Sequence, residues 1–511
     1  MLGFSRRSVK FGGIKPAAFK EHTLRSRIMP TPLPAELLLS LQQHQGDAAV
    51  PVVNVGDKVL KFDLIAKASD TQGLNLHAPT SGEIVSVSEE IDPFGSGITQ
   101  RCIRIQCDGE DNSTSLRGTE DYRLLSAQEC LQRVRDAGVC GMGGAGFPTA
   151  TKLQHSIEKA CELVLVNAAE CEPYISCDEA LIRERAEAVV LGAEVLQYIT
   201  SANSAQIVIE ADKLDAISSL RRCLADSPVE LKLVKPLYPA GDESQLIYGA
   251  TGREIPADSL PSDIGIAVIN AGTATSVAAA VVEGKPCISR IVTLAGSALQ
   301  TPKNFDALLG MPANHLLALA GIDSTLHKDT IVGGSLMGKY LLEDDSPISK
   351  TSNCIIATSV NEFPSQPEAI ACIRCGFCAD ACPAHLLPQQ LYRYAKENQL
   401  DLLADHGLRD CIECGACAYV CPSKIPLVQY YRWGKEALAE EDETKAHSTN
   451  WQQRFHSMQF RRKRIGEQNA RAKSTASQSA GHTKDFSRDQ ARAEIAAAVA
   501  RVKKKRAEAP E

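Results

Sequence analysis

Apolar and polar positions follow two different patterns along this chain, and the change between them predicts its domains. Between residues 32 and 125, short apolar runs alternate with Gly-Asp and Pro-x-x-Gly turns, as in residues 77–85. Short strands at this spacing predict a small β-sandwich. At Ser126 the period becomes that of a helix, because Ser126 and Glu129 form a capping-box pattern ahead of an amphipathic run.

The next part of the chain alternates predicted strands with predicted helices. Strand-like runs occur at residues 163–166, 205–210, 230–234 and 265–269, and the longest helical period covers 182–198. This alternation is typical of a doubly wound α/β sheet, in which ligands bind at the carboxyl ends of the strands. The uncharged run 264–282 has the length of a membrane span, but Asn270 and Gly272 favour a buried strand, a turn and a buried helix.

The carboxyl-terminal part has a different composition. Residues 436–481 are rich in Glu, Lys, Arg, Gln and Ser and poor in β-branched residues, which predicts a largely disordered segment. Ser487 and Gln490 are positioned to cap a final helix, with a narrow apolar stripe between Ile495 and Val502. A solvated tail helix is the favoured interpretation, and docking to a partner or to anionic lipid is the alternative.

The bulk composition is that of a multidomain globular protein. The chain has 511 residues and a net charge of −7, which gives no indication of nucleic-acid binding. Residues 1–20 are basic but lack an apolar core, so we predict no signal peptide and expect a soluble chain. Eight of the 18 Cys lie between residues 372 and 421, and the others occur singly, as buried small apolar residues usually do.

The clustered cysteines repeat one spacing. Each run reads C-x2-C-x2-C-x3-C-P, the spacing of a ferredoxin with two 4Fe–4S clusters. In such a ferredoxin, the fourth Cys of each run binds the cluster held by the other run. The spacing therefore assigns four ligands to each cluster: Cys372, Cys375, Cys378 and Cys421 to the first, and Cys411, Cys414, Cys417 and Cys382 to the second.

Zinc and disulfides explain this spacing less well. Zinc takes four ligands, which would leave half of these thiolates without a function, and disulfides are disfavoured in a chain without a secretory signal. Helix-like runs at residues 388–398 and 400–406 lie between the two motifs and predict an α-helical ferredoxin domain. His385 and His406 are expected to be surface or packing residues, because eight thiolates already complete two clusters.

A glycine-rich segment follows the first predicted helix. It contains Gly141, Gly143, Gly144 and Gly146, with Lys152 shortly downstream. Its formal G-x-G-x-x-G match is weak, because the dinucleotide fingerprint follows a strand and not a helix. The glycine amides instead predict a nest that approaches a phosphate or a flat ring, with Lys152 supplying charge; a mobile turn is the alternative.

Polar residues follow three of the predicted strand ends. Residues that lie at the same edge of a doubly wound sheet are expected to share a ligand site with the glycine segment. Solvated loop carboxylates are the alternative for the acids among them. The residues are Asn167, Glu170 and Glu172, then Gly241, Asp242 and Glu243, and finally Asn270 and Thr273.

These segments carry a resemblance to known proteins. Residues 141–152, 167–173, 241–243 and 270–273 look like the flavin- and NADH-binding segments of the complex I flavoprotein subunit superfamily. Residues 32–125 resemble a barrel-sandwich hybrid domain, without the Lys that a carrier domain needs for covalent attachment. With the ferredoxin motifs behind them, their order is similar to the C subunit of the Rnf/Rsx ion-translocating electron-transport complex.

The resemblance implies a site for FMN and NADH. FMN would be held by the loop glycines together with Asn167, Glu170 and Asn270, and NADH would stack over it near Phe147 and Glu172. Gly241, Asp242 and Glu243 would line the same pocket. Two positions depart from the complex I pattern, since Ala169 stands where an acid is usual and Asp242 where Glu is usual.

The same resemblance implies a domain order and a function. The expected function is that of a peripheral subunit on the cytoplasmic face of the bacterial inner membrane, which passes electrons between NADH, FMN and two 4Fe–4S clusters. Its partners would be the membrane and iron–sulfur subunits of the complex, and ferredoxin or another low-potential acceptor. The expected domains are a barrel-sandwich hybrid (1–125), a Rossmann-like FMN/NADH-binding α/β domain (126–286), a β-grasp domain with short helices at 304–309 and 314–320 (287–350), an α-helical ferredoxin domain (361–434) and a charged, largely disordered tail (435–511).

Two other functions fit the same motifs. One is a soluble flavin and iron–sulfur NADH-dependent reductase, similar to the cobalamin reductase of propanediol utilisation. The other is an iron–sulfur electron-wiring adaptor that binds no flavin. Absorbance of the purified protein separates the adaptor, because it would show cluster bands without a flavin spectrum.

Overall fold

The computed structural model describes residues 12–91, 99–257, 259–363, 368–480 and 488–507. The chain divides into two compact units, Met1–Lys435 and Glu436–Glu511. Within the first unit, buried apolar residues from the amino-terminal sandwich, the parallel sheet and the mixed sheet form one continuous core. The domains of this unit therefore share a core and do not pack as separate globules.

The amino-terminal domain is the predicted β-sandwich. One antiparallel sheet has the order β2 (Glu36–Ser40), β8 (Thr99–Cys107), β7 (Gly82–Ile91) and β4 (Lys58–Val59), and the other has the order β3 (Val50–Pro51), β5 (Leu64–Lys67) and β6 (Leu76–His77). Alternate residues point into the core, as Leu37 and Leu39 of β2 and Ile103 and Ile105 of β8 do, and all four are fully buried.

The α/β domain contains a four-stranded parallel sheet. Its order is β11 (Glu230–Val234), β10 (Ser204–Glu210), β9 (Leu163–Asn167) and β12 (Ile266–Asn270). Strands β9, β10 and β12 are largely buried, and burial of this kind needs the apolar runs from which the sheet was predicted. Its helices are α1 (Ala127–Asp136), α2 (Thr149–Glu158), α3 (Cys177–Thr200), α4 (Leu214–Cys223), α5 (Glu243–Thr251) and α6 (Ala271–Ala278), with short helical turns η1 (Tyr122–Leu124), η2 (Leu224–Asp226), η3 (Pro261–Ile264) and η4 (Ala279–Glu283). The predicted capping box at Ser126 and Glu129 is present at the start of α1.

A six-stranded mixed sheet follows in the chain. Its order is β1 (Met29–Pro30), β14 (Lys303–Leu308), β13 (Ser289–Ala295), β17 (Cys354–Ser359), β15 (His327–Val332) and β16 (Lys339–Tyr340), with α7 (Ala313–Leu319) beside it. Strands β1 and β17 lie outside the segment 287–350 that was predicted as a separate domain. The helix predicted at 304–309 is wrong, because this segment pairs with β13 as a strand and buries the alternate residues Phe305 and Ala307.

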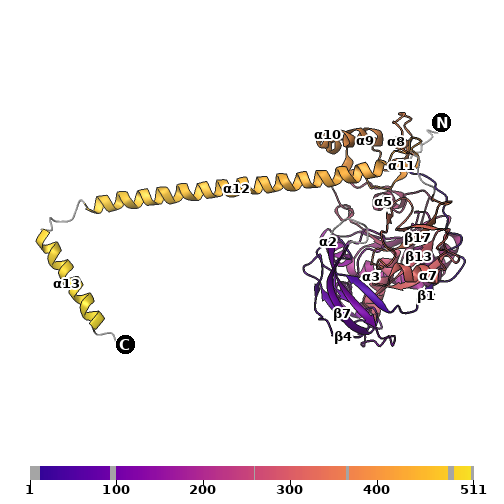
Figure 1. Cartoon of the computed structure of the whole chain (residues 1–511), viewed down its shortest axis with the longest axis horizontal. Helices are drawn as coiled ribbons and strands as arrows, with labels where there is room; N and C mark the ends of the chain where they lie inside the picture. Colours follow the sequence, from indigo (N-terminus) through magenta and orange to yellow (C-terminus); the bar gives the residue numbers. More distant parts are fainter. Residues whose placement is uncertain (1–11, 92–98, 258, 364–367, 481–487, 508–511) are drawn as a thin grey trace. The chain divides into compact units, whose positions relative to one another are not determined.

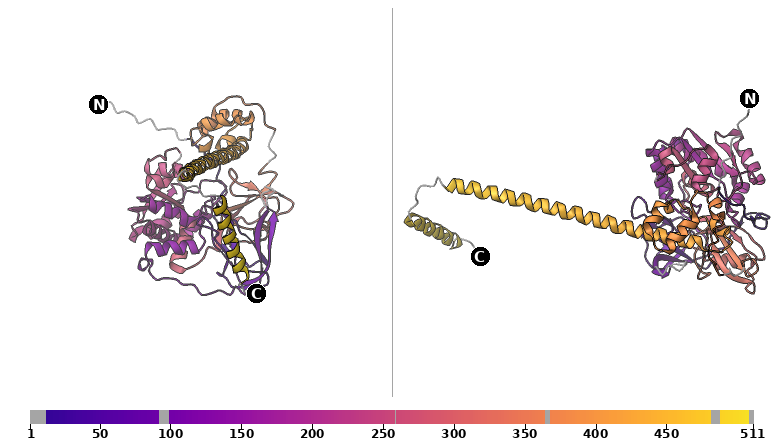
Figure 2. Two further views of the ribbon diagram at one scale, coloured as in Figure 1. Left: turned by 90° about the vertical axis from the view of Figure 1, so that its left-hand side faces the viewer. Right: turned by 90° about the horizontal axis from the view of Figure 1, so that it is seen from above.

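The cysteine-rich part of the first unit is helical. It contains α8 (Phe377–Ala381), α9 (Pro388–Lys396), α10 (Leu400–Asp405), η5 (Leu408–Asp410) and α11 (Ala416–Tyr419), and the start of α12 (Leu427–Ala480). The helices predicted between the two cysteine motifs are therefore present as α9 and α10. Figures 1 and 2 show this orange group on one side of the first unit, where α8 and α11 lie close to α5.

The second unit differs from the prediction of disorder. Its described residues belong to α12 and to α13 (Arg488–Ala507). Residues 436–480 contain no Pro and a single Gly, Gly466, so nothing in this segment terminates a helix. An ion pair between Lys445 Nζ and Glu441 Oε1 at 2.6 Å adds support along the helix. Across the described residues, none of the helices has both the length and the apolarity to cross a bilayer.

Candidate functional site

The eight clustered cysteines line two separate cavities. Cys382, Cys411, Cys414 and Cys417 surround the first, which we call the inner site. Cys372, Cys375, Cys378 and Cys421 line the second, which we call the outer site. The structure thus places the fourth Cys of each run with the first three of the other run. This arrangement agrees with the two ligand sets that the cysteine spacing predicts.

The two cysteine runs fold into the same turn. Arg374 and Glu413 have left-handed φ angles of 56° and 55°, and Gly376 and Gly415 follow at 83° and 76°. In each run, a left-handed residue and a left-handed Gly are separated by one Cys. Together they turn the chain tightly around a small volume, whereas a helix or a strand would continue straight. Each Gly then caps a short helix, α8 or α11.

The chemistry of the donors fits iron–sulfur clusters. Three cysteines of the inner site are buried and Cys411 is half-buried. Burial raises the pKa of Cys414 to about 12 and also raises the pKa of Cys382. A buried thiol of this kind remains protonated at neutral pH unless a metal supplies positive charge. Four sulfur donors around one cavity match a cubane cluster, and a His pair for zinc is absent from the described lining residues.

The inner site contacts the α/β domain directly. The hydroxyl of Tyr238 donates to the carbonyl oxygen of Cys414 at 2.5 Å, and the amide of Gln245 in α5 donates to the carbonyl oxygen of Pro383 at 3.2 Å. The amino-terminal segment fills the remaining gap, since a Cβ on Gly12 would lie 2.1 Å from the carbonyl oxygen of Cys382. The inner site is therefore held against the domain in which the nucleotide site was predicted.

The glycine segment forms an open turn with free amides. Gly141 N–H donates to the carbonyl of Phe147, and Gly146 N–H donates back to the carbonyl of Gly141. Three consecutive residues of the turn are exposed: Gly143, Gly144 and Ala145. Within the described part of the chain, no hydrogen bond uses their N–H groups. Gly144 has a φ of 119°, which L-residues rarely adopt. Consecutive free amides on such a turn can hold a phosphate, so this segment fits a flavin nucleotide.

Thr273, in the first turn of α6, anchors the glycine turn. Its hydroxyl accepts a 2.8 Å hydrogen bond from the buried N–H of Met142. Asn270 lies just before it and caps α6, because its side-chain oxygen accepts from Thr273 N at 3.2 Å. A Cβ on Gly143 would lie 3.5 Å from the Cβ of Asn270. The structure therefore brings the glycine turn against the end of β12, as the sequence predicts.

Asn167 and Asn270 lie side by side at the carboxyl edge of the sheet. They are partners in the parallel register of β9 and β12. The Asn167 amide donates to the carbonyl of Gly241 at 2.8 Å, which ties the end of β9 to the turn before α5. Gly241 must approach closely here, because a Cβ would lie 2.4 Å from the carbonyl oxygen of Ala169. Three of the predicted segments thus meet at one edge.

The structure gives Glu170 a structural contact that the sequence does not indicate. Both of its carboxylate oxygens accept hydrogen bonds from the first turn of α3, from Asp178 N at 2.9 Å and from Glu179 N at 3.3 Å. A carboxylate at this position also complements the helix dipole. Contact between the Glu170 side chain and FMN stays a prediction.

Glu172 joins the α/β domain to the mixed sheet. Its Oε1 accepts from Leu336 N at 2.6 Å and Met337 N at 3.3 Å, and burial raises the pKa of its carboxyl group. Its Oε2 is buried, and among the described residues it has no hydrogen-bond partner. Gly334 packs on this side chain so closely that any Cβ there would collide with it. The hydroxyl of Tyr238 lies beside this carboxyl group and opposes the effect of burial on its pKa.

The remaining predicted residues lie at the start of α5. Asp242 caps this helix by accepting from Ser244 N at 3.1 Å, and burial raises the pKa of its carboxyl group. Glu243 forms a 2.5 Å ion pair with Lys152 of α2. The charge expected from Lys152 is thus already balanced within the chain, and the pair connects the glycine turn region with α5.

Sequence reasoning missed several buried polar residues beside this site. Arg290 donates to the carbonyl of Met142 at 3.1 Å, and Lys350 donates to the carbonyl of Gly138 at 2.6 Å. Both side chains therefore fix the backbone at, or just before, the glycine turn. Lys20 donates to the carbonyl of Glu170. Asp178 accepts from the amide of Asn270 at 2.6 Å. No local pattern marks these residues, because their partners come from distant parts of the chain.

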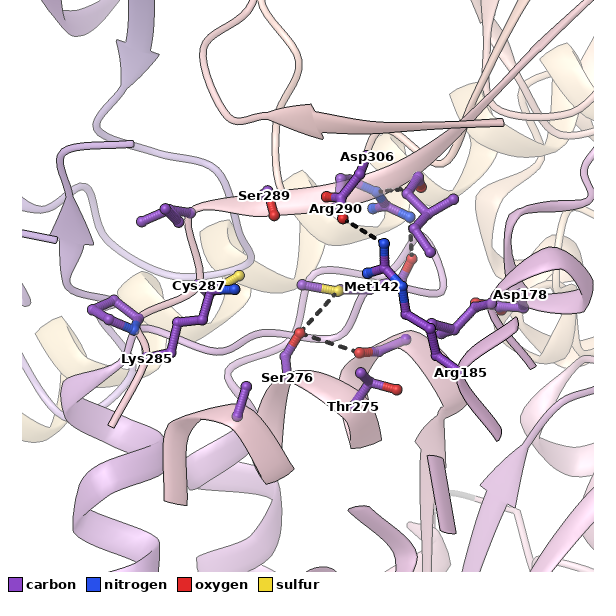
Figure 3. A pocket seen from close by; sticks show the side chains of 16 residues that line it. Met142, Asp178, Arg185, Thr275, Ser276, Lys285, Cys287, Ser289, Arg290 and Asp306 are labelled. Carbon is purple, nitrogen blue, oxygen red and sulfur yellow. Dashed lines mark hydrogen bonds and ion pairs between the residues drawn. The ribbon is translucent and has the colours of Figure 1, made fainter. Parts of the chain in front are cut away.

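A cavity of about 120 Å³ lies beside this edge, between α3, α6 and the start of β13 (Figure 3). An ion pair between Arg185 and Asp306 at 3.0 Å spans it, and the Ser276 hydroxyl points to the sulfur of Met142 at 3.6 Å. Two of its lining residues, Met142 and Gly272, belong to the predicted segments 141–152 and 270–273. The cavity therefore adjoins the predicted site.

Three family descriptions match the chain in the order that the fold shows. Residues 9–110 match the RnfC barrel sandwich hybrid domain, residues 134–279 the Nuo51 FMN-binding domain, and residues 371–425 the 4Fe-4S dicluster domain. These matches confirm the predicted sandwich, the FMN-binding domain and the two-cluster ferredoxin domain.

Curated relatives match most of the chain. It is 43% identical over 399 residues to the C subunit of the ion-translocating oxidoreductase complex of Pseudomonas aeruginosa, covering 78% of this chain and 52% of that protein. It is 40% identical over 400 residues to the protein of the same description from Serratia proteamaculans, covering 78% of this chain and 57% of that protein. The chain thus spans little more than half the length of these relatives.

A solved NAD+-reducing [NiFe]-hydrogenase in its H2-reduced state is similar at a TM-score of 0.45 and 20% identity, over 61% of this chain and 63% of that one. A likeness of this strength supports no argument about function. The fold and its two kinds of site define a modular protein with an FMN-binding domain and a 4Fe–4S dicluster domain. Within that class, the chain is similar to the C subunits of ion-translocating oxidoreductase complexes over the part that matches.

Proposed function

We propose that this chain is a peripheral subunit of a membrane-bound ion-translocating complex, and that it passes electrons between NADH, through FMN, and two 4Fe–4S clusters. It would link NAD(H) to ferredoxin or another low-potential acceptor. FMN, when bound, supplies the conversion between a hydride and single electrons that joins a nicotinamide to a cubane cluster. The protein itself binds, orients and insulates these groups.

The observation that carries the proposal is the contact between the inner site and the α/β domain. Tyr238 and Gln245 of that domain hydrogen-bond to the backbone at Cys414 and Pro383. The same domain presents the glycine turn, Asn167 and Asn270 at the edge of its sheet. A nucleotide site and a cluster site in one packed unit are what a continuous electron path requires.

The residues at the sheet edge have distinct proposed roles. The free amides around Gly143 and Gly144 would hold the FMN phosphate or ring, and Thr273 would keep the turn in place through Met142. Glu172, whose carboxyl group is buried, would face the nicotinamide together with Phe147. Asp242 and Glu243 would close the pocket from α5. No proton donor or acceptor is required from the protein for hydride transfer.

The outer site would exchange electrons with the partner. Cys372 and Cys375 are exposed, whereas the four cysteines of the inner site are buried or half-buried. Three apolar side chains close to them in the chain are also exposed: Ile370 at 62%, Ile373 at 62% and Phe377 at 55%. An apolar rim around an exposed redox centre suits transient docking of another redox protein. We therefore infer the order nucleotide, inner site, outer site, partner.

Anaerobic titration of the reconstituted chain with NADH tests the proposal. We expect the flavin absorbance to bleach first and the cluster absorbance to fall next, with iron and sulfide contents that match two cubanes. Cluster bands without a flavin spectrum would leave only the flavin-free adaptor. Zinc in place of iron would remove the proposal altogether.

The place of the chain in a complex needs a separate measurement. The relatives that it matches are named for an ion-translocating complex, and this supports a peripheral position on the cytoplasmic face of the inner membrane. Affinity purification of the chain from detergent-solubilised membranes should recover membrane and iron–sulfur subunits of the complex. Recovery of a fully active reductase without them would favour the soluble-reductase alternative.

A further inference from the structure

Residues 444–476 of α12 form a strongly basic stretch, which we call the basic segment. It holds eight Lys and Arg residues and one acid, Glu467, whereas the whole chain has a net charge of −7. Four of the cations are consecutive: Arg461, Arg462, Lys463 and Arg464. Such a concentration of one sign in an acidic protein indicates a negatively charged partner.

The basic segment also carries an exposed apolar stripe. Trp451, Phe455, Met458 and Ile465 are spaced by four, three and seven residues, so they share one side of the helix. Their exposed fractions are 65%, 53%, 37% and 56%. The Arg454 guanidinium lies 5.0 Å from the centre of the Trp451 ring, so cations flank the stripe directly.

We propose that the basic segment binds the surface of an anionic phospholipid bilayer. The apolar stripe would enter the boundary between headgroups and acyl chains, and the flanking cations would contact lipid phosphates. An interfacial helix is recognised by this combination of a Trp- and Phe-containing face with Lys and Arg around it. The segment lies on the bilayer in this proposal and does not cross it, because it is too polar to do so.

Two other partners fit the stripe less well. A nucleic acid would use the cations, but contact with phosphate gives no role to Met458 and Ile465. A coiled-coil partner needs apolar positions sustained over three or more heptads, and this stripe ends at Ile465. Binding to lipid is independent of the proposed electron transfer, because it concerns only residues of the second unit.

Sedimentation of the full chain with lipid vesicles tests the inference. We expect binding to vesicles of phosphatidylglycerol and phosphatidylcholine, weakening with added salt, and no binding to phosphatidylcholine alone. Two variants should each lower the apparent affinity by about tenfold or more. One replaces the four consecutive cations together, as Arg461→Gln, Arg462→Gln, Lys463→Gln and Arg464→Gln, and the other combines Trp451→Ser with Phe455→Ser.

Matched controls make the same chemical changes on the first unit. Neutralising four exposed lysines there removes as much charge, and replacing two exposed leucines by Ser removes comparable apolar surface; neither should change the affinity. The control variants are Lys58→Gln, Lys67→Gln, Lys232→Gln and Lys235→Gln together, and Leu124→Ser with Leu214→Ser.

Tryptophan fluorescence gives a second readout. The chain has two Trp residues, so Trp433→Phe leaves Trp451 as the only indole. Its emission should shift to shorter wavelength when anionic vesicles are added, because the ring leaves water. The inference is overturned if the chain binds neither kind of vesicle, if the controls lose as much affinity as the basic-segment variants, if duplex DNA binds while vesicles do not, or if the Trp451 emission stays unchanged on sedimenting vesicles.

Discussion

At the scale of single residues, Gly241 shows how little space separates the predicted segments. Its Cα position lies so close to Ala169 that an added Cβ would come within 2.4 Å of a carbonyl oxygen. Since the backbone cannot yield as a flexible side chain does, we expect the turn before α5 to move away from β9 in any variant with a larger residue. The predicted nucleotide site at the carboxyl edge of the sheet would then widen.

Gly241→Ala should destabilise the chain by about 1–3 kcal/mol and weaken FMN binding. Gly249→Ala is the matched control in the same helix-turn region, because its nearest neighbour is a Val234 methyl at 3.5 Å. An Ala inside α5 should be neutral or stabilise by about 0.5–1 kcal/mol. Urea unfolding followed by circular dichroism measures both, and equal midpoints for the two variants would contradict the close contact.

Glu210, at the end of β10, predicts a pH dependence. Burial raises the pKa of its carboxyl group from 4.5 to about 7, against the opposing effect of Lys213 and Lys20. A raised carboxyl pKa favours the folded protein when the group is protonated, so this contribution is complete below pH 4.5 and is lost as the pH rises toward 7. The loss amounts to roughly 3 kcal/mol.

Glu210→Gln does not titrate and should lack this loss. The stability of the unmodified chain relative to the variant should therefore fall between pH 4.5 and about pH 7, as measured by urea denaturation at a series of pH values. Glu230→Gln, on the exposed start of β11, serves as the control and should leave the pH profile unchanged. A relative stability that rises with pH would show that the Glu210 pKa is not raised.

The sequence predicts residues whose chemistry is local. The cysteine spacing assigned ligand sets that line two separate cavities, and the polar residues after strands do meet at one edge. Arg290 and Lys350 could not be found in this way, because each donates to backbone carbonyls of the glycine segment from more than a hundred residues away. Every residue has a backbone carbonyl, so a sequence pattern does not show which carbonyls a buried cation will contact.

At the scale of elements, the crossed cysteine runs predict an unusual result for single ligand changes. Cys382→Ser should remove the inner cluster although Cys382 belongs to the first run, and Cys421→Ser should remove the outer cluster although Cys421 belongs to the second. Each variant should keep about half of the iron, and electron paramagnetic resonance should show the remaining cluster.

Cys223→Ser is the control, since this half-buried Cys lies far from both sites in the chain, and it should keep the full iron content. If Cys382→Ser instead lost the signal of the exposed outer cluster and kept that of the inner one, the assignment of ligands would be wrong. The two variants also distinguish the sites in the NADH titration. Only the inner-site variant should block electron flow from the flavin to the remaining cluster.

Elements were predicted well where their own apolar pattern is clear, and less well where a pairing partner or a lack of helix breakers decides. The parallel strands and the sandwich have apolar patterns that their burial requires. Residues 304–309 contain a helix-compatible pattern, but pairing with β13 makes them a strand, so the tertiary partner overrides the local preference. The charged segment after residue 436 is helical although it buries little, because it lacks residues that break helices.

At the scale of the whole molecule, changes to the exposed apolar rim of the outer site should slow electron exchange with the partner protein and leave the other steps unchanged. Ile370→Ser with Phe377→Ser should slow electron exchange with a small one-electron acceptor protein by about tenfold, because apolar contact is lost at the rim. Bleaching of the flavin by NADH and the iron content should remain unchanged. Stopped-flow absorbance measures both steps.

The matched control for the rim is Leu214→Ser, which alters an apolar side chain that is 71% exposed on α4. It should leave exchange with the acceptor at its original rate. A rim variant that exchanges electrons as fast as the control would place the exit elsewhere on the first unit. One that loses iron would show that the two residues maintain the cluster.

The segment around Gly12 has a consequence for how the protein is made. Gly13 donates to the carbonyl of Ala381, and Ile14 pairs with Tyr238, so these early residues complete contacts with parts of the chain that follow them by more than two hundred positions. During synthesis they must wait until the first cysteine run has left the ribosome. The inner site is completed later still, because three of its cysteines lie between residues 411 and 417.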